Sequence, residues 1–405
     1  MRSRYRDALS SPPFRALFTA QLVSITGTTV AAVALTVLVY RRTSSPLLSS
    51  STFALGFVPY LLGGLLSAVV DRVPPRRLVI ASSAASAAVA AAMAWPGAPI
   101  PLLLAGLVAI GMLTSVSSGA TAALLRASVP EDAYAPARSV LRIVAQVAQI
   151  GGNAAGGALL VLLSPSGAIL VDAISFAAAA LLVRLGVRPV AVSGRRAEAS
   201  LLRDSLAGAR VVFAQRELRR LLLLGWLVPT FTVAPEALAA PYVAGVGASA
   251  AFVGIWLVAL PVGMIAGDLL GVWRLTSEQQ RRVVAPAAAA SFLPYLAFAV
   301  HPGLALALPL LAVGGLGAVY SLGLDLRVRD AAGSRLFARA MTLNSAGLMT
   351  LQGLGFALAG AEAQLAGSPA AIAIAGACGI AAAVLFGPWR AAQTSETVVS
   401  SRLEA

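Results

Sequence analysis

The chain has 405 residues, of which 59 % are hydrophobic and only 11 % are charged, whereas charged residues make up roughly 25 % of a typical soluble domain. This composition excludes an ordinary soluble enzyme and a disordered protein, and a single cysteine, Cys378, excludes a disulfide-stapled domain. All 30 basic residues are arginines, and the net charge is +14. Because the arginines stand in short clusters between apolar runs, they indicate the topology of a membrane protein and not a nucleic-acid-binding surface.

The apolar runs predict an all-α polytopic membrane protein. A helix needs about 20 mainly apolar residues to cross the ~30 Å hydrocarbon layer of a bilayer. Twelve runs of this kind follow one another along the chain, six in each half. They cover 14–39, 49–70, 78–97, 99–125, 138–163, 167–186, 220–245, 249–273, 283–300, 303–326, 336–362 and 369–389.

The arginines predict the orientation of these spans. If the N-terminus is cytoplasmic and the spans alternate in direction, every arginine except Arg41 and Arg42 falls on the cytoplasmic side. Such an excess of positive charge inside is the usual topology signal. We therefore expect a multi-pass protein of a bacterial inner (plasma) membrane with both termini in the cytoplasm.

A long cytoplasmic connection divides the chain into two bundles of six helices. The expected division is residues 1–190, a linker with an amphipathic helix at 191–218, and residues 219–405. The halves echo each other, because Ala137-Arg138 and Ala338-Arg339 each lead into a glycine-rich span. Six plus six spans with internal repetition are the signature of a two-bundle transporter.

The segment after the second span carries the most specific motif. It reads GLLSAVVDRVPPRRL over residues 64–78, with an Asp-Arg pair followed by two arginines. It resembles the loop between spans two and three of the major facilitator superfamily. The resemblance implies the two-bundle fold of that superfamily and a cytoplasmic latch that holds the halves together, formed by Asp71, Arg72, Arg76 and Arg77.

Three further segments resemble one branch of the superfamily, the drug, macrolide and siderophore exporters of the drug:proton antiporter type. They lie at 125–132, 172–176 and 314–344. The resemblance implies proton-coupled export of small amphipathic molecules, such as drugs or secondary metabolites, by alternating access. Two departures stand out: Asn153 replaces a proline of the branch's span-five motif, and Thr28 replaces an acidic residue of span one.

Acidic residues within spans are candidate proton carriers. Burial favours the neutral form of a carboxyl group, so such a group can bind and release protons as its surroundings open to either side. Glu236 is the first candidate, in span seven after Pro229 and Pro235, and Asp172 in span six is the second. Asp268 is expected to pair with an arginine in a second-half latch, and Glu362, at a span end, is expected to be solvated or paired.

Uncharged polar and aromatic residues are candidates for the lining of a central substrate cavity. Gln146, Gln149 and Asn153 stand at i, i+3 and i+7 and therefore share one helix face. A polar face within a membrane must point into the protein, toward a cavity or a hydrogen bond. The full candidate set is Gln21, Thr28, Gln146, Gln149, Asn153, Trp226, Phe231, Asn344 and Gln352.

Several alternatives remain open at this point. A membrane enzyme is disfavoured, because the sequence offers no acidic metal cluster, no zinc-ligand set and no nucleotide-binding loop. Within transport, an uncoupled facilitator, an uptake transporter or a lipid flippase would share the same pattern of spans. We expect a monomer in the lipid bilayer that acts on a small molecule and protons, without a cofactor, a metal or a nucleic acid.

Overall fold

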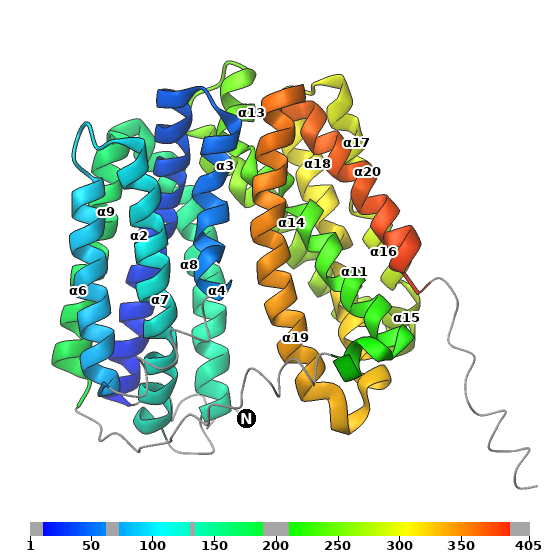
Figure 1. Cartoon of the computed structure of the whole chain (residues 1–405), viewed down its shortest axis with the longest axis horizontal. Helices are drawn as coiled ribbons and strands as arrows, with labels where there is room; N and C mark the ends of the chain where they lie inside the picture. Colours follow the sequence, from blue (N-terminus) through cyan, green and yellow to red (C-terminus); the bar gives the residue numbers. More distant parts are fainter. Residues whose placement is uncertain (1–10, 62–72, 130–133, 189–209, 389–405) are drawn as a thin grey trace, which may run out of the picture.

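The computed structural model describes residues 11–61, 73–129, 134–188 and 210–388. Within these ranges every regular element is a helix. Figure 1 shows two helical bundles side by side, an N-half (residues 11–188, blue to blue-green) and a C-half (residues 210–388, green to red). The predicted all-α polytopic fold is therefore confirmed.

The N-half contains five long apolar helices and the first part of a further span. That further span starts as α3 and continues through a short 3-10 turn, η1, into α4 at the edge of the described residues. The bounds are α2 Pro12–Thr43, α3 Pro46–Ala54, η1 Leu55–Phe57, α4 Val58–Leu61, α6 Pro75–Met93, α7 Ile100–Ser128, α8 Tyr134–Leu162 and α9 Pro165–Gly186.

The C-half has more interrupted helices. Its first span is broken and bends by 44° after Ala237, and its third, Val284–Val300, consists of short pieces. The bounds are α11 Arg216–Thr232, α12 Ala234–Ala237, α13 Ala239–Gly245, α14 Phe252–Arg274, α15 Ser277–Arg282, α16 Val284–Ala290, α17 Leu293–Leu296, η3 Ala297–Val300, α18 Leu304–Leu316, η4 Gly317–Val319, α19 Tyr320–Ala366 and α20 Ser368–Phe386.

The long helix α19 is two helices joined at Gly333. This residue has φ 57° and ψ −178°, a conformation that only glycine adopts without strain. One span therefore ends before Gly333, and the next span begins after it. Each of the twelve predicted apolar runs overlaps a helix of the structure.

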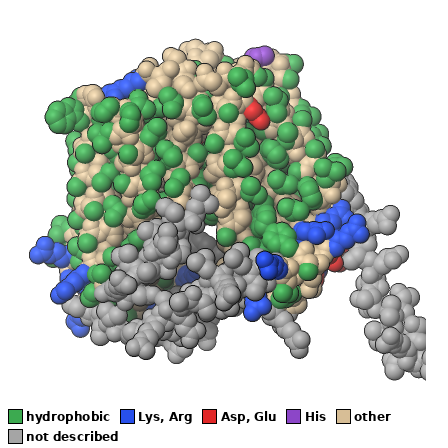
Figure 2. Space-filling model, viewed as in Figure 1, with side chains coloured by type: hydrophobic (Ala, Val, Ile, Leu, Met, Phe, Trp, Pro, Cys, Tyr) green, Lys and Arg blue, Asp and Glu red, His purple; other side chains and the backbone are tan. Residues whose placement is uncertain are grey.

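Arginines mark one end of the molecule. Figure 2 shows them gathered along the lower edge, beneath a surface that is mostly apolar. We call this the Arg-rich end and the opposite one the Arg-poor end. Arg41 and Arg42 finish α2 at the Arg-poor end, where Arg42 donates a 2.6 Å hydrogen bond to the carbonyl oxygen of Ala98.

The described end of the predicted linker packs on the C-half. Residues 189–209 lie outside the described ranges, so only its last part, 210–218, is placed. Val212 is buried in the C-half core together with Leu218, and the ring of Phe213 lies 5.7 Å from that of Trp226. This stretch is therefore anchored to the second bundle.

The two halves meet near the Arg-poor end through α3 and α19. A Cβ at Gly360 would collide with the Ser50 side chain and would lie 3.0 Å from the Cα of Leu47, so only glycine allows this approach. The ring of Phe356 stacks on that of Phe53 at 5.2 Å, and the Ser45 hydroxyl donates a 2.7 Å hydrogen bond to the side-chain oxygen of Gln364.

A second join brings α8 against α14. A Cβ at Gly157 would lie 2.5 Å from the carbonyl oxygen of Ala251 and 2.7 Å from the Cα of Gly254. A Cβ at Gly254 would in turn lie 2.5 Å from the carbonyl oxygen of Asn153. Because both backbones touch here, the two halves pack without space between them at this level.

Candidate functional site

One face of α8 changes from exposed to buried along its length. Gln146 and Gln149, toward the Arg-rich end, are exposed, whereas Asn153 is 9 % exposed and Gly157 is buried against α14. These four residues stand at i, i+3, i+7 and i+11, so they point in one direction, toward the C-half. The polar face is thus open near the Arg-rich end and closed at Gly157.

The facing helix of the C-half shows the same change. In α19, Thr342 and Ser345 are exposed, whereas Phe356 and Gly360 are buried against α3. They stand at i, i+3, i+14 and i+18, which again is one face of a helix. The region between the halves is therefore accessible from the Arg-rich end and closed toward the Arg-poor end.

Glu236 lies where the first span of the C-half is broken. Its side chain is half-buried, and no described residue donates a hydrogen bond to it or forms an ion pair with it. The carbonyl groups freed by the break have partners: Trp256 donates to Pro235 at 2.7 Å, and Tyr295 donates to Thr232 at 3.1 Å. The break is thus a stable feature, and the carboxyl group inside it has no partner among the described residues.

Tyr295, which was not singled out in the sequence, and Trp256 lie beside the helix break. Both are fully buried, and Tyr295 lies close enough to Glu236 to interact electrostatically with it. Trp256 packs its ring 4.5 Å from that of Tyr242, whose hydroxyl donates a 2.6 Å hydrogen bond to the carbonyl oxygen of Pro302. Only the three-dimensional fold brings these aromatic residues to the helix break, because they come from separate spans.

Asp172 lies in a different environment, between α2 and α9 of the N-half. It is 3 % exposed, and one of its carboxyl oxygens accepts hydrogen bonds from Thr28 at 3.1 Å and Ser175 at 3.2 Å. A Cβ at Gly27 would collide with Ser175, so the two helices touch at this point. The candidate cavity residue Thr28 is thus engaged with the second candidate proton carrier.

The remaining C-half candidates lie among α11, α12 and α19. Trp226 is buried and donates a 3.1 Å hydrogen bond to the backbone oxygen of Asn344. The Asn344 side chain faces Gly225, and Phe231 lines a small pocket near the Arg-poor end. Gln352 is half-buried on α19.

Gln21 of α2 has a side-chain oxygen that is buried and accepts no hydrogen bond from the described residues. A buried amide oxygen without a donor is unfavourable by about 1–3 kcal/mol, so such groups usually have a water or a ligand as partner. Within the described part of the chain, Gln21 is therefore a candidate whose buried side-chain oxygen lacks a donor.

The predicted latch lies partly outside the described residues. Asp71 and Arg72 fall in the range 62–72. Arg76 donates a 2.6 Å hydrogen bond to the carbonyl oxygen of Arg184 in the same half, and Arg77 follows it in the first turn of α6. The described part of this motif thus ties α6 to α9.

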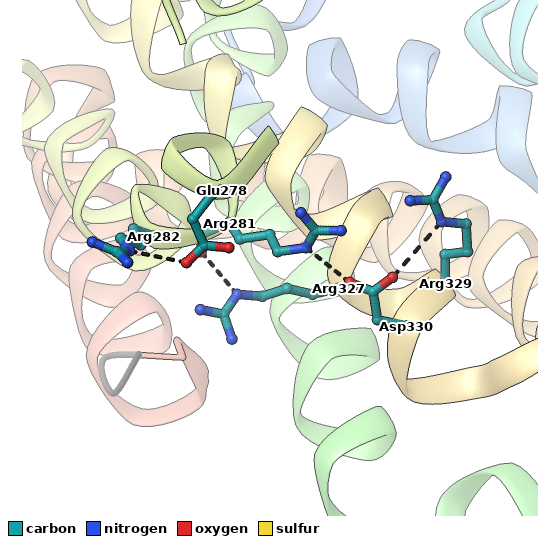
Figure 3. A network of polar contacts seen from close by, with 6 residues as sticks. All are labelled: Glu278, Arg281, Arg282, Arg327, Arg329 and Asp330. Carbon is teal, nitrogen blue, oxygen red and sulfur yellow. Dashed lines mark hydrogen bonds and ion pairs between the residues drawn. The ribbon is translucent and has the colours of Figure 1, made fainter. Parts of the chain in front are cut away.

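A charged cluster occupies the Arg-rich end of the C-half (Figure 3). Arg281 forms a 2.8 Å ion pair with Asp330, and Arg282 forms one of 3.0 Å with Glu278. Arg327 is 7 % exposed and donates a 2.8 Å hydrogen bond to the carbonyl oxygen of Arg281. The contacts of Arg281 with Asp330 and Arg327 fasten the short helix α15 to α19, whereas the Arg282–Glu278 pair lies within α15.

The predicted ion pair of Asp268 was wrong for the described part of the chain. One of its carboxyl oxygens is buried without a hydrogen-bond partner there, and its close neighbour is Tyr320. The reason is its depth: Asp268 lies six residues before Arg274, the end of α14, and Arg281 lies further on, in α15. Arg281 pairs with Asp330 instead.

Comparison with known proteins identifies the family. The sequence profile of the Major Facilitator Superfamily matches residues 17–334. The chain belongs to this superfamily. It therefore has the fold of a secondary transporter that works by alternating access across a membrane. No curated protein sequence matches the chain.

Solved structures of this superfamily type share the fold. A bacterial homolog of the human lysosomal transporter Spinster, in an inward-facing and unoccupied conformation, aligns with a TM-score of 0.68 at 15 % identity, covering 93 % of this chain and 97 % of the other. The nucleoside transporter NupG aligns with a TM-score of 0.71 at 13 % identity, covering 92 % and 98 %. The POT family transporter PepTSo aligns with a TM-score of 0.70 at 10 % identity, covering 98 % and 99 %.

Proposed function

We propose that this chain is a secondary transporter that exports small amphipathic molecules in exchange for protons. The proposal rests on the facing sides of α8 and α19. Their residues are exposed toward the Arg-rich end and buried against the other half toward the Arg-poor end. By the positive-inside rule the Arg-rich end is cytoplasmic, with both termini on that side of a bacterial plasma membrane. The structure then has the conformation that receives a molecule from the cytoplasm.

The chemistry of the open faces favours an amphipathic cargo without a high charge. The amides of Gln146 and Gln149 and the hydroxyls of Thr342 and Ser345 are exposed there, on helices whose other residues are mainly apolar. A mostly apolar site with a few hydrogen-bonding groups suits broad recognition of drug-like molecules or secondary metabolites. Trp226, Phe231 and Gln352 belong to the same proposed pathway on the C-half side.

Glu236 is the better of the two proposed proton carriers. It has no hydrogen-bond partner among the described residues, and α12, which carries it, lies against α3 across the join at the Arg-poor end. Separation of the halves at that end would therefore uncover Glu236. Asp172 by contrast has two hydroxyl partners within the N-half, and the same movement does not separate them.

Export and proton coupling belong together energetically. One proton that moves down a potential of 100 mV supplies about 2.3 kcal/mol, enough to sustain roughly a 50-fold concentration gradient. Neither a cofactor nor a catalytic group is needed for this exchange. The proposal is therefore a transporter without enzymatic activity that works as a monomer with a small molecule, protons and the lipid bilayer as its partners.

The test is proton release from proteoliposomes. The protein is reconstituted with an imposed proton gradient, a panel of amphipathic compounds is added, and proton flux is measured for the wild type, Glu236→Gln and Asp172→Asn. We expect compounds to release protons with the wild type and Asp172→Asn but not with Glu236→Gln, while labelled compounds still bind to all three.

Three outcomes would revise the proposal. Equal proton release by Glu236→Gln would exclude Glu236 as the carrier, and a loss confined to Asp172→Asn would transfer that role to Asp172. Equilibration of labelled compounds without any proton movement would replace the exporter by an uncoupled facilitator. Movement of labelled lipid between the leaflets, with none of the compounds transported, would indicate a flippase.

A further inference from the structure

A small pocket lies in the C-half near its Arg-poor end, between α11, α12, α19 and α20. Its volume is about 10 Å³, room for one water-sized group. Small residues form its walls, and one aromatic ring and one carboxyl group border it. The lining residues that matter here are Thr230, Phe231, Gly355, Ala359, Glu362 and Ala375.

Glu362 is the only charged residue among those that line this pocket. Its side chain is half-buried, and the described part of the chain offers it neither a hydrogen bond nor an ion pair. It stands four residues before Ala366, the end of α19, or roughly 6 Å along the helix axis. This depth is close to the boundary between hydrocarbon and headgroups at the Arg-poor end.

The surface around Glu362 is apolar. Leu354, Leu358 and Leu365 are exposed on α19, Leu365 by 90 %, and together with Glu362 they follow the i, i+4, i+8, i+11 spacing of one helix face. Figure 2 shows that the surface in the upper part of the molecule is mostly hydrophobic. A stripe of exposed leucines on a membrane helix faces lipid, so the carboxyl group borders the lipid phase.

A carboxylate in this position needs a positively charged partner. A charged group that borders the hydrocarbon region is costly unless a partner neutralises it, and the described residues supply none to Glu362. A neighbouring aromatic face such as that of Phe231 attracts cations. The Thr230 hydroxyl donates its proton to the carbonyl oxygen of Trp226, so its lone pairs can only accept further hydrogen bonds.

We propose that this pocket binds the primary ammonium group of an amphipathic molecule, with Glu362 as its counter-ion and the acyl or alkyl chain lying along the exposed leucines of α19. The volume limits the headgroup to one the size of water, which excludes a trimethylammonium group. A phosphatidylethanolamine lipid and a cargo with a primary amine offer the same chemistry. The inference does not rest on export or on proton coupling.

The test measures retention of amphipathic amines by the purified full chain. Native mass spectrometry counts molecules that stay bound after exchange into detergent with phosphatidylethanolamine, phosphatidylcholine, a long-chain primary alkylamine or its N-trimethyl analogue. Glu362→Gln is compared with the wild type, and Glu278→Gln, which removes an acid at the opposite end, is the matched control.

We expect the wild type and Glu278→Gln to retain the primary amines about tenfold more strongly than Glu362→Gln, the change that follows from losing a charge-assisted hydrogen bond. Retention of phosphatidylethanolamine would identify a lipid as the natural source, and retention of the alkylamine alone would identify a cargo. Ala375→Val, which fills the pocket and keeps the carboxyl group, should abolish the difference between primary and trimethylated amines by excluding both.

Two results would overturn the proposal. One is equal retention of primary amines by the wild type and Glu362→Gln, when thermal unfolding curves show that both proteins are folded. The other is retention of phosphatidylcholine or the N-trimethyl analogue as strong as that of the primary amines, since the pocket is too small for such a headgroup.

Discussion

Two acidic residues inside the membrane region differ in their hydrogen-bond partners. Asp172 accepts two hydrogen bonds from hydroxyl groups, whereas Glu236 accepts none from the described residues. Both were identified in the sequence because acidic residues in spans are rare. Their surroundings could not be predicted, since Thr28 is 144 positions from Asp172 and Tyr295 comes from a different span than Glu236.

The partners of Asp172 lead to a prediction about stability. Asp172→Asn keeps an oxygen that can accept the hydrogen bonds of Thr28 and Ser175, whereas Asp172→Ala leaves both hydroxyls without that acceptor. We expect Asp172→Ala to lower the free energy of unfolding by about 1–3 kcal/mol and Asp172→Asn by less than half of that. Thermal unfolding of the purified variants measures the difference, and an equal loss in both would show that the hydrogen bonds do not stabilise this helix pair.

At the scale of elements, the broken first span of the C-half is fixed by hydrogen bonds from neighbouring helices. Pro229 and Pro235 both lie in this span, but the 44° bend follows Ala237 while Pro229 lies inside α11. Proline marks where a helix is weakened. The actual position of the break depends on which carbonyl groups find donors, and this information lies in Trp256 and Tyr295.

The join of α8 and α14 leads to a prediction about conformation. A single methyl group added by Gly157→Ala would collide with the backbone of Ala251, whereas the same change at Gly151 meets no atom within 4 Å. Overpacking of this kind costs about 1–3 kcal/mol, so Gly157→Ala should shift the population toward molecules open at the Arg-poor end. Gly151→Ala is the matched control and should leave the population unchanged.

Labelling of a cysteine at position 149 measures that shift. The exposed side chain of Gln149 lies on the open face of α8, and the variant Gln149→Cys is made in a Cys378→Ala background. We expect Gly157→Ala to slow its reaction with a maleimide several-fold, because the open face closes when the halves rock. An unchanged rate would mean that the glycine contact does not control the conformation.

The charged cluster at the Arg-rich end of the C-half leads to a prediction about how much each of its residues contributes to the free energy of unfolding. Asp330 is about half exposed and pairs with Arg281 in contact with water, so Asp330→Asn should cost only about 0.2–1 kcal/mol of unfolding free energy. Arg327 is buried, and its hydrogen bond to a backbone oxygen would be lost in Arg327→Leu, leaving that oxygen without a donor. We expect the Arg327 variant to be the less stable of the two by thermal unfolding; the reverse order would contradict the account.

At the scale of the whole molecule, the sequence predicted the fold class and the places of the spans. Apolar runs and arginine clusters are local signals, and each predicted run overlaps a described helix. The conformation could not be predicted in this way. It depends on contacts between residues far apart in the chain, such as Gly157 with Gly254 and Phe53 with Phe356, whose packing is visible only in three dimensions.

The proposed pathway lies between the halves and opens on the cytoplasmic side. It can be tested by the side of the membrane from which Gln149→Cys, in a Cys378→Ala background, reacts with a membrane-impermeant maleimide. We predict rapid labelling in inside-out vesicles, where the cytoplasmic side faces the reagent, and little labelling in right-side-out vesicles. Rapid labelling in right-side-out vesicles alone would contradict both the orientation and the direction in which the pathway opens.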